Sequence, residues 1–407
     1  MLRSGKPMGC PPDRSFCELV VALSTILDIE EETKLYHAWR VALVAQELAR
    51  RVIPDEATLV FYGGLLHDIG AMGLDDHLVH LALQRGSRNN PEVVNHPLRG
   101  ADMVAAIPGL GEKVAAMIRD HHERWNGSGY PRGIAGNHIV MGAMLLGLAD
   151  ELDLVLRVHP GTSWARLRET LNRRVQGGFP PELLAILDKM MNGPLYAEIA
   201  TNTALELKMF KVILDLPPIN FQVPDPMKIT IDLFARIIDA KHAYTAGHSH
   251  RVAAYALNLA RCLGYNDAKL RRLEIAGLLH DFGKIAVPRA ILDKQGRLNS
   301  EELKVVRRHP AWTIELLEGV TSLKDIARDA GLHHERYDGK GYPYGLHDGE
   351  IPLGARIIAV ADAFDAMTSN RPYQPTRTPE EALKILAGGA GTQFDPEVTA
   401  VASCLLA

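Results

Sequence analysis

Leu65-Leu66-His67-Asp68-Ile69-Gly70 recurs 213 residues later as Leu278-Leu279-His280-Asp281-Phe282-Gly283. Four further blocks follow in the same order in both halves of the chain, at offsets of 212 to 215 residues. The first-half blocks are Asn95-His96-Pro97, His121–Pro131, Leu148-Ala149-Asp150 and Phe179–Glu182, and their partners are Arg308-His309-Pro310, His333–Pro343, Val360-Ala361-Asp362 and Phe394–Glu397. Five blocks in a fixed order do not arise from composition alone, so the chain contains two copies of one module of about 180 residues, a typical domain size.

Apolar residues within each copy recur with a helical period. The stripe in the first copy is Val41, Val44, Ala45, Leu48 and Val52, and the stripe in the second is Val252, Ala253, Ala256, Leu259, Ala260 and Leu263. Such spacing places one apolar face along a helix. No alternation of apolar and polar residues is long enough to require a sheet. We therefore predict an all-α fold of two tandem helical bundles.

A proline-rich stretch separates the two copies. Leu216–Pro226 contains four prolines, which forbid a helix interior and favour extended backbone. The preceding residues, 197–214, are predicted to form a helix. We place the first module at residues 15–193, a helical connector and linker at 194–227, and the second module at 228–407.

Composition narrows the function classes. The 407 residues include 45 Lys+Arg and 49 Asp+Glu, a formal net charge of −4, which argues against binding a nucleic-acid polymer by bulk charge. No apolar run approaches the roughly 20 residues that span a bilayer, and the first residues contain no apolar signal segment. The four cysteines lack C-x-x-C spacing. We expect a cytoplasmic protein with no membrane partner.

Histidine is the residue type that carries chemistry here, with 17 in the chain. The candidate metal ligands of the second copy are His248, His280, Asp281, His309, His333, His334 and Asp362. Five imidazoles and two carboxylates exceed one mononuclear site and suit two adjacent divalent metals with one carboxylate bridging. His280 and Asp281 are neighbours on a predicted helix, so their side chains diverge by about 100° and meet only where a helix end approaches the metals.

The first copy repeats this set. Its counterparts, each beside the same flanking residues, are His37, His67, Asp68, His96, His121, His122 and Asp150. A lone histidine is more readily explained as a packed or surface residue. The same ordered set in two copies instead favours joint metal binding, so a second metal site is predicted in the N-terminal module.

His280-Asp281-Phe282-Gly283-Lys284 together with His333–Pro343 (HHERYDGKGYP) resembles the HD-GYP subfamily of HD-domain metal-dependent phosphohydrolases. The resemblance covers nearly all of residues 228–400 and, more weakly, 15–193. It implies an HD-type all-α fold, a binuclear or trinuclear metal centre, and hydrolysis of cyclic dinucleotides such as cyclic di-GMP. Trinuclear members carry a Glu four residues before the first histidine; this sequence has Tyr244 there, so two metals are expected.

The resemblance also implies individual roles. One metal would be held by His248, His280, Asp281 and Asp362, and Asp281 would bridge to a second held by His309, His333 and His334. Lys284 would contact the substrate phosphate or the nucleophilic water, and Arg371 would bind phosphate. Catalysis is therefore assigned to Asp281 and Lys284. The metals expected are two divalent transition ions, Fe or Mn, with Ni, Co and Zn as alternatives.

The Gly-Tyr-Pro segment has two open interpretations. Tyr342 could stack a substrate base or present a surface to a signalling partner, and we include it among the substrate-binding residues. The alternative is a rigid turn that supports His333 and His334. Long helical modules could also pair as a homodimer, although no heptad pattern supports one, so the oligomeric state stays open.

The first copy lacks several groups of the second. Ala71 stands where Lys284 is, His159 aligns with Arg371, Ser128 replaces Lys340, and Asn126 replaces Asp338. Retained ligands without phosphate-contacting cations predict a regulatory, substrate-sensing or weakly active module. The alternative is a scaffold in which metals act only as structural staples.

The expected activity is a phosphodiesterase for cyclic di-GMP, 3',3'-cyclic GMP-AMP or both, yielding a linear dinucleotide or mononucleotides. An HD-domain phosphohydrolase acting on mononucleotides is disfavoured by the second-metal histidines and the Gly-Tyr-Pro block. A non-catalytic cyclic dinucleotide receptor is disfavoured by Lys284 and Arg371. Base specificity, metal identity and input signal are not encoded in these motifs.

Overall fold

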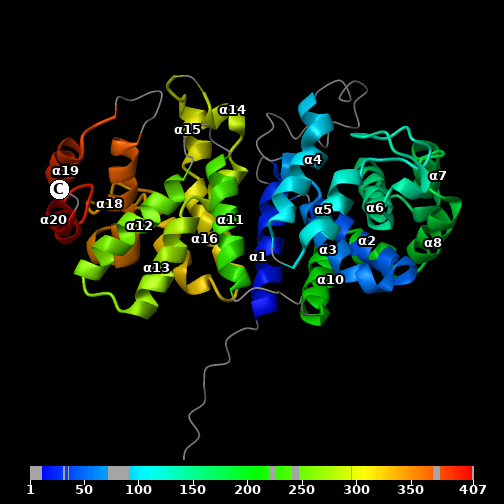
Figure 1. Ribbon diagram of the computed structural model, residues 1–407, viewed down its shortest axis with the longest axis horizontal. Helices are drawn as coiled ribbons and strands as arrows, with labels where there is room; N and C mark the ends of the chain where they lie inside the picture. The colour runs from blue at the N-terminus through cyan, green and yellow to red at the C-terminus, as the bar shows by residue number, and fades with distance from the viewer. Residues whose placement is uncertain are drawn as a thin grey trace, which may run out of the picture. The chain divides into compact units, whose positions relative to one another are not determined.

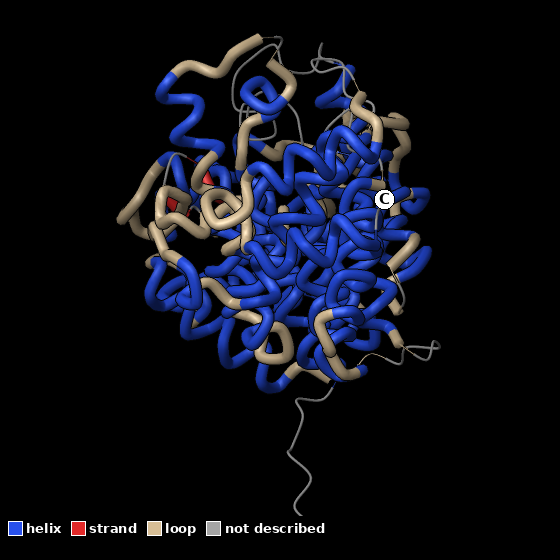
Figure 2. The backbone as a smooth tube through the Cα atoms, turned by 90° about the vertical axis from the view of Figure 1, so that its left-hand side faces the viewer, coloured by secondary structure: helices blue, strands red, loops and turns tan. Residues whose placement is uncertain are grey.

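The computed structural model describes residues 12–30, 33–34, 36–71, 91–107, 109–217, 219, 225–240, 247–294, 296–369 and 376–405. These residues form helices joined by loops (Figures 1 and 2), with one two-residue antiparallel ladder between β1 (Ile29–Glu30) and β2 (Thr33–Lys34). The all-α fold predicted from periodicity is confirmed. No described helix is both long and apolar enough to cross a membrane.

The chain divides into two units, which meet in sequence at Pro226 and Met227. The N-terminal unit contains α1 (Pro12–Leu27), α2 (His37–Val52), η1 (Pro54–Glu56), α3 (Ala57–Leu66), η2 (Ile69–Ala71), α4 (Pro91–Ala105), α5 (Gly111–Asp120), η5 (Gly136–His138), α6 (Met141–Val158), α7 (Trp164–Arg174), α8 (Pro181–Met191), α9 (Leu195–Ile199) and α10 (Asn202–Asp215).

The C-terminal unit repeats the central helices of this arrangement. Its elements are α11 (Pro226–Ala240), α12 (His248–Cys262), α13 (Asp267–Leu279), η6 (Phe282–Ala286), α14 (Arg289–Leu292), α15 (Ser300–Val306), α16 (His309–Glu318), η7 (Lys324–Ile326), α17 (Ala327–Gly331), η8 (Asp348–Glu350), α18 (Leu353–Thr368), α19 (Pro379–Gly388) and α20 (Pro396–Leu405).

The core of each unit is built on the predicted apolar stripes. In the N-terminal unit α2 packs against α3 and α6, and in the C-terminal unit α12 packs against α13 and α18. Val41, Leu48, Val252 and Leu259 are completely buried at these contacts. Burial of such side chains is the main favourable contribution to folding, so the stripes fix which helix faces meet.

Glycine permits the closest of these helix contacts. A Cβ atom on Gly64 of α3 would lie 2.4 Å from the Cα atom of Ala42 in α2. Gly277 of α13 approaches Ala253 of α12 in the same way, where a Cβ atom would lie 3.0 Å from its Cα atom. Each pair of backbones therefore crosses near the end of the helix that precedes a His-Asp pair.

A candidate metal centre in each unit

The candidate ligands of the C-terminal unit lie mainly at helix ends. His248 begins α12 and His309 begins α16, whereas His280 and Asp281 occupy the turn between α13 and η6. His333 and His334 follow α17, and Asp362 lies within α18. The prediction that His280 and Asp281 share a helix is wrong, because α13 ends at Leu279. The pair directly follows the last residue of α13, and His280 keeps helical backbone angles, so a helix end brings both side chains to the cluster.

A carboxylate fixes the start of α2 and another fixes the start of α12, the helices that begin with His37 and His248. Asp28 Oδ2 accepts a hydrogen bond of 2.8 Å from the backbone N–H of Ala38, the second residue of α2. Asp239 accepts from both the N–H and the hydroxyl of Ser249, the second residue of α12. These bonds satisfy helix N–H groups that otherwise lack a partner. They hold the first turn of α2 and α12 in place.

The ligand atoms of the C-terminal unit form two groups around one carboxylate. His248, His280 and Asp281 make up one group and His309, His333 and His334 the other, with the ligand atoms of each within 4.8 Å of one another. Asp281 Oδ2 lies 3.3 Å from His280 Nε2, and Asp281 Oδ1 lies 3.3 Å from His309 Nε2. The two oxygens of Asp281 therefore face different groups. Asp362 Oδ1 lies 3.4 Å from His248 Nε2, beside the first group.

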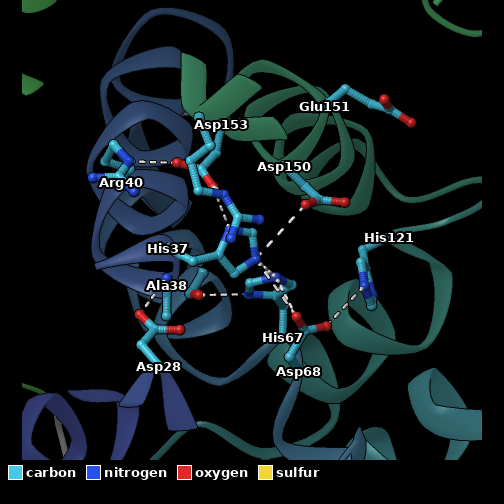
Figure 3. Close-up of polar contacts among 12 residues, drawn as sticks. Asp28, His37, Ala38, Arg40, His67, Asp68, His121, Asp150, Glu151 and Asp153 are labelled. Carbon is cyan, nitrogen blue, oxygen red and sulfur yellow. Dashed lines mark hydrogen bonds and ion pairs between the residues drawn. The ribbon is translucent and has the colours of Figure 1, made fainter. Parts of the chain in front are cut away.

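The N-terminal unit builds the same arrangement (Figure 3). Its groups are His37, His67 and Asp150, and Asp68, His96, His121 and His122. Asp68 Oδ2 lies 3.2 Å from His67 Nε2, and Asp68 Oδ1 lies 3.3 Å from His96 Nε2. Figure 3 shows His37, Asp150 and His121 arranged around the Asp68 carboxylate. The structure thus brings together all fourteen sequence-predicted ligands, seven in each unit.

Backbone carbonyls set the orientation of six imidazoles. The Nδ1 atoms of His280, His309 and His333 lie 2.8, 2.7 and 2.7 Å from the carbonyl oxygen three residues earlier. His67, His96 and His121 repeat this contact at 2.8, 2.6 and 2.6 Å. A carbonyl oxygen can only accept, so Nδ1 carries the proton and Nε2 presents its lone pair to the cluster.

The inward atoms are the ones that would bind a metal. Among the described residues, the buried atoms without a hydrogen-bond partner include His280 Nε2, His309 Nε2, His333 Nε2 and Asp281 Oδ1, and, in the N-terminal unit, His96 Nε2, His121 Nε2, His122 Nε2 and Asp68 Oδ1. Leaving one such group unpaired costs about 1–3 kcal/mol. Imidazole and carboxylate donors together suit divalent transition metals, so the residues of both units fit the expected ions.

Electrostatics favour the ligating protonation states of Asp281 and His333 but oppose that of His280. Burial would raise the pKa of the Asp281 carboxyl, but the Lys284 ammonium and His280 hold it well below its ordinary value. Burial, reinforced by His280, lowers the pKa of His333 to about 3. Burial also lowers the pKa of His280, yet the Asp281 charge outweighs it and raises that pKa to about 9. A metal would compete with this proton between Asp281 and His280.

A carboxylate stands behind the first histidine of each cluster, and the sequence analysis missed it. His248 Nδ1 lies 2.7 Å from Asp365 Oδ2, and Arg251 Nε donates to the same carboxylate at 2.6 Å. In the N-terminal unit Asp153 takes this place, contacting His37 Nδ1 at 2.6 Å and the Arg40 guanidinium. The sequence repeat could have identified these Asp and Arg residues, because their spacing from the ligands is the same in both copies. An Arg follows the first histidine by three positions, and an Asp follows the last ligand by three, in both copies.

Glu335 shapes the Gly-Tyr-Pro loop. Its buried carboxylate accepts hydrogen bonds from the consecutive backbone N–H groups of Tyr344, Gly345 and Leu346, at 2.7, 3.1 and 3.1 Å. Glu123 binds residues 132–134 in the same way. A buried carboxylate with several N–H donors fixes a loop firmly, because losing any donor leaves a charge poorly solvated.

This loop places Tyr342 against a candidate ligand. The Tyr342 and His334 rings stack with centroids 4.9 Å apart and planes inclined by 24°, and the Arg307 guanidinium lies 5.3 Å from the Tyr342 centroid. Tyr130 stacks on His122 likewise, at 4.6 Å and 26°. In both units a tyrosine of this loop packs against the second histidine of the His-His pair, His334 or His122. Arg371 and Tyr244 lie outside the described residues.

Of the positions that differ between the copies, Lys284 lies beside the cluster of its unit. Lys284 Nζ is 2.5 Å from Asp281 Oδ2, and its side chain is 23% exposed. Ala71 holds the equivalent place at the end of η2, and His159 is exposed at the end of α6. In the N-terminal unit Arg157 Nε lies 2.9 Å from Asp153 Oδ2, a contact that the sequence analysis did not foresee.

Residues 22–173 and residues 232–398 each match the HD domain family. Together the two stretches make up well over half of the chain. The chain belongs to the HD domain family. The predicted resemblance to HD-domain phosphohydrolases is thereby confirmed. Both matched stretches contain a complete set of the histidines and aspartates described above.

Within the HD domain family the chain is similar to cyclic dinucleotide phosphodiesterases. It is 36% identical over 302 residues, 74% of this chain, to 3'3'-cGAMP-specific phosphodiesterase 3 of Vibrio cholerae. It is 30% identical over 380 residues, 89% of this chain, to 3'3'-cGAMP-specific phosphodiesterase 1 of the same organism. The aligned parts span 64% and 85% of those two proteins.

A solved structure aligns with nearly the whole length of the chain. The crystal structure of a V. cholerae cyclic GMP-AMP-specific phosphodiesterase, V-cGAP3, aligns with a TM-score of 0.66 and 29% sequence identity, covering 96% of this chain and 97% of that one. The chain is also 42% identical over 177 residues to the cyclic di-GMP phosphodiesterase response regulator RpfG of Xanthomonas campestris, which is 43% of this chain and 47% of that protein.

Proposed function

We propose that this protein is a metal-dependent phosphodiesterase that hydrolyses cyclic dinucleotides, namely cyclic di-GMP, 3',3'-cyclic GMP-AMP or both, in its C-terminal unit. One observation carries the proposal. The two oxygens of Asp281 face separate histidine groups, while the Lys284 ammonium contacts the same carboxylate at 2.5 Å. Similarity to proteins named as phosphodiesterases for both cyclic dinucleotides supports the substrate class.

The ligand assignment follows the two groups. His248, His280 and Asp362 would hold one divalent ion, His309, His333 and His334 would hold the other, and Asp281 would contribute to both. When bound, such a pair supplies Lewis-acid stabilisation of a phosphodiester and lowers the pKa of a water nucleophile. The imidazole and carboxylate donor set suits Fe or Mn, with Ni, Co and Zn as alternatives.

The side chains around the pair orient and neutralise the substrate. Lys284 is partly exposed while in contact with Asp281, so its Nζ can donate a hydrogen bond to a phosphate oxygen beside the ions. Arg371, which lies outside the described residues, is proposed from the sequence resemblance as a second cation, because a guanidinium can donate two parallel hydrogen bonds to phosphate. Burial raises the pKa of the Tyr342 hydroxyl to about 12, so it stays protonated and can donate to the substrate.

The bond changes are those of phosphodiester hydrolysis. A water oxygen bonds to phosphorus, the bond from phosphorus to one ribose oxygen breaks, and that oxygen takes up a proton. One cleavage opens the ring to a linear dinucleotide, and a second releases mononucleotides. Lys284 and Arg371 lower the barrier by neutralising negative charge that grows on the phosphate oxygens.

The N-terminal unit has a different part in this proposal. It keeps a complete ligand set, so it binds metal, but Ala71 offers no cation to a phosphate. We assign it a regulatory or weakly active role. A non-catalytic receptor for the same nucleotide is the second candidate for this unit, because ligand binding requires the ions but not the ammonium.

Product analysis tests the proposal. Full-length protein reconstituted with Mn(II) or Fe(II) is incubated with cyclic di-GMP, 3',3'-cyclic GMP-AMP or GTP, and products are separated by liquid chromatography and mass spectrometry. We expect linear dinucleotides from at least one cyclic substrate and little turnover of GTP. Turnover of GTP alone would support a mononucleotide phosphohydrolase, and binding without cleavage would support a receptor; either result contradicts the proposal.

A further inference from the structure

A buried hydroxyl brackets the turn that carries the His-Asp pair of the C-terminal unit. Thr313 Oγ1 donates a hydrogen bond of 3.2 Å to the carbonyl oxygen of His280 and accepts one of 2.9 Å from the N–H of Gly283. Thr313 is completely buried, so water cannot replace either bond. One side chain thus holds both ends of the segment that contains Asp281.

This hydroxyl also connects the two ligand groups. Thr313 lies in α16, one helical turn after His309, the first residue of that helix. The turn approaches α16 so closely that a Cβ atom on Gly283 would lie 2.0 Å from the carbonyl oxygen of His309. The place of Asp281 relative to His309 is therefore set by this contact and by the hydroxyl that fastens it.

The N-terminal unit keeps the close contact but lacks the hydroxyl. A Cβ atom on Gly70 would likewise lie 2.0 Å from the carbonyl oxygen of His96, yet the residue equivalent to Thr313 is Gly100. The ligands still gather around Asp68. The hydroxyl is therefore not needed to assemble a cluster. It is present in the unit that has Lys284 and absent from the unit that has Ala71.

Lys284 is attached to the same turn. Its backbone N–H donates to the carbonyl oxygen of Asp281 at 2.8 Å, and its residue directly follows Gly283. The direction of the Lys284 side chain therefore depends on the peptide planes that Thr313 holds. A hydrogen-bonded threonine also loses little side-chain entropy, because its β-branched χ1 is already restricted.

We infer that Thr313 is a positioning residue for hydrolysis, whose hydroxyl fixes the 280–284 turn so that Asp281 and Lys284 stay aligned on the reacting phosphodiester. This inference rests on the proposed function of the C-terminal unit. It extends that function by a residue that is neither a ligand nor in contact with substrate. The two units would then differ functionally at two residues of this region. Lys284 corresponds to Ala71, and Thr313 corresponds to Gly100.

Three variants at one position test the inference in the full-length, Mn(II)-reconstituted protein. Thr313→Val removes the hydroxyl at nearly constant volume and should lower kcat about tenfold, the equivalent of one buried hydrogen bond at 1.4 kcal/mol per decade. KM should change less than about twofold, since substrate contacts remain. Thr313→Ser should restore kcat to within about twofold, and Thr313→Gly should resemble Thr313→Val. Metal content per chain should stay at the wild-type value in all three.

Thr399→Val is the matched control. Thr399 is also buried in the C-terminal unit, and its hydroxyl bonds the backbone carbonyls of Asp395 and Pro396 in and before α20. This variant should keep wild-type kcat while losing a comparable amount of thermal stability. Equal kcat loss in Thr399→Val and Thr313→Val would show a general stability effect and overturn the inference.

The other outcomes are equally decisive. A Thr313→Val protein with wild-type kcat, a Thr313→Ser protein without rescue, or loss of bound metal in step with kcat would each overturn a positioning role. A wild-type protein that cleaves no cyclic dinucleotide is a separate result, because it contradicts the proposed function itself. Turnover by the wild-type protein tests the proposed function, whereas the ratio of variant kcat to wild-type kcat tests the role of Thr313. The two kinds of failure can therefore be distinguished.

Discussion

The two units share their ligand geometry and differ in the groups beside it. In each unit one carboxylate faces two sets of imidazoles, Asp68 in the first and Asp281 in the second. The shared geometry comes from helix ends, close glycine contacts and backbone carbonyls, all of which the fold supplies. Lys284 and Thr313 are single side chains, replaced by Ala71 and Gly100 without loss of the cluster. A duplicated fold can thus keep the geometry of a candidate metal centre while the side chains beside it differ.

The bridging carboxylates give the sharpest contrast between the units. Asp281→Ala should lower turnover of the cyclic substrate by on the order of 10³-fold, because both ions of the proposed catalytic pair lose a ligand. Asp68→Ala should leave turnover within about threefold of wild type. Steady-state hydrolysis and metal content, measured on both variants, check the pair. The reverse ranking would assign catalysis to the N-terminal unit.

The Lys284 ammonium should account for the next largest difference. Lys284→Ala is expected to lower kcat about 10²-fold with metal content unchanged, because it removes a cation that stabilises developing charge. Lys304→Ala is the matched control, since Lys304 forms an i,i+3 pair with Glu301 as Lys284 does with Asp281, but on the surface. Wild-type kcat in Lys284→Ala would show that the ammonium has only a structural role.

Variants of Asp365 and Asp153, which contact His248 and His37, should separate effects on metal binding from effects on turnover. Asp365→Asn keeps the size of the side chain but weakens its hold on His248, so metal affinity should fall about 10–100-fold and turnover with it. Asp153→Asn should weaken metal binding in the N-terminal unit to a similar degree while leaving turnover nearly unchanged. Metal titration of each variant by calorimetry, beside hydrolysis rates, distinguishes these results. Loss of turnover in Asp153→Asn alone would contradict the comparison.

The smallest predicted effect is the loss of stability of the metal-free protein at acidic pH, and it should arise in both units. In the metal-free protein, burial holds the pKa of His121 well below its ordinary value and that of His333 at about 3, whereas an unfolded histidine titrates near 6.5. Below about pH 6.5 the unfolded chain binds protons that the folded chain does not, so stability falls as pH falls. His37 and His280, with pKa values raised to about 10 and about 9, act in the other window, where stability is lost as pH rises above about 6.5.

Thermal denaturation measures this acid sensitivity. The Tm of metal-stripped protein should drop by about 3 °C or more between pH 6.5 and pH 5.5. Metal-loaded protein serves as the control and should change less, because coordinated imidazoles resist protonation. A metal-free Tm that does not change over this interval would mean that the imidazoles are not held neutral in the fold.

Much of the site was accessible from the sequence because the chain contains its own comparison. Ten histidines and four aspartates could be paired between the copies, and each pair lies in a cluster. The all-α fold followed from apolar spacing alone. The positions of Ala71 and Lys284 in the repeat also revealed the asymmetry before any distance was known.

Contacts between distant side chains were not accessible in this way. Asp365 reaches His248 across 117 residues, and Thr313 reaches His280 across 33. The repeat marks Asp153 and Asp365 as a shared position, but it does not identify their partners, since a carboxylate or hydroxyl on a helix has no preferred partner until another helix packs beside it. Even the adjacent pair His280 and Asp281 was misplaced on a helix, because the end of α13 is fixed by its packing as well as by local propensity.

By itself, the sequence determined the repeat, the helical class, the set of candidate ligands that lie together and the residues that differ between the units. These properties depend on composition and spacing along the chain. Only the tertiary structure decided which oxygen of Asp281 faces which histidine group, which imidazole nitrogen carries the proton, and which hydroxyl bonds the turn that contains the His-Asp pair. Those features depend on the directions of side chains from separate helices, and packing alone brings such side chains within hydrogen-bond distance.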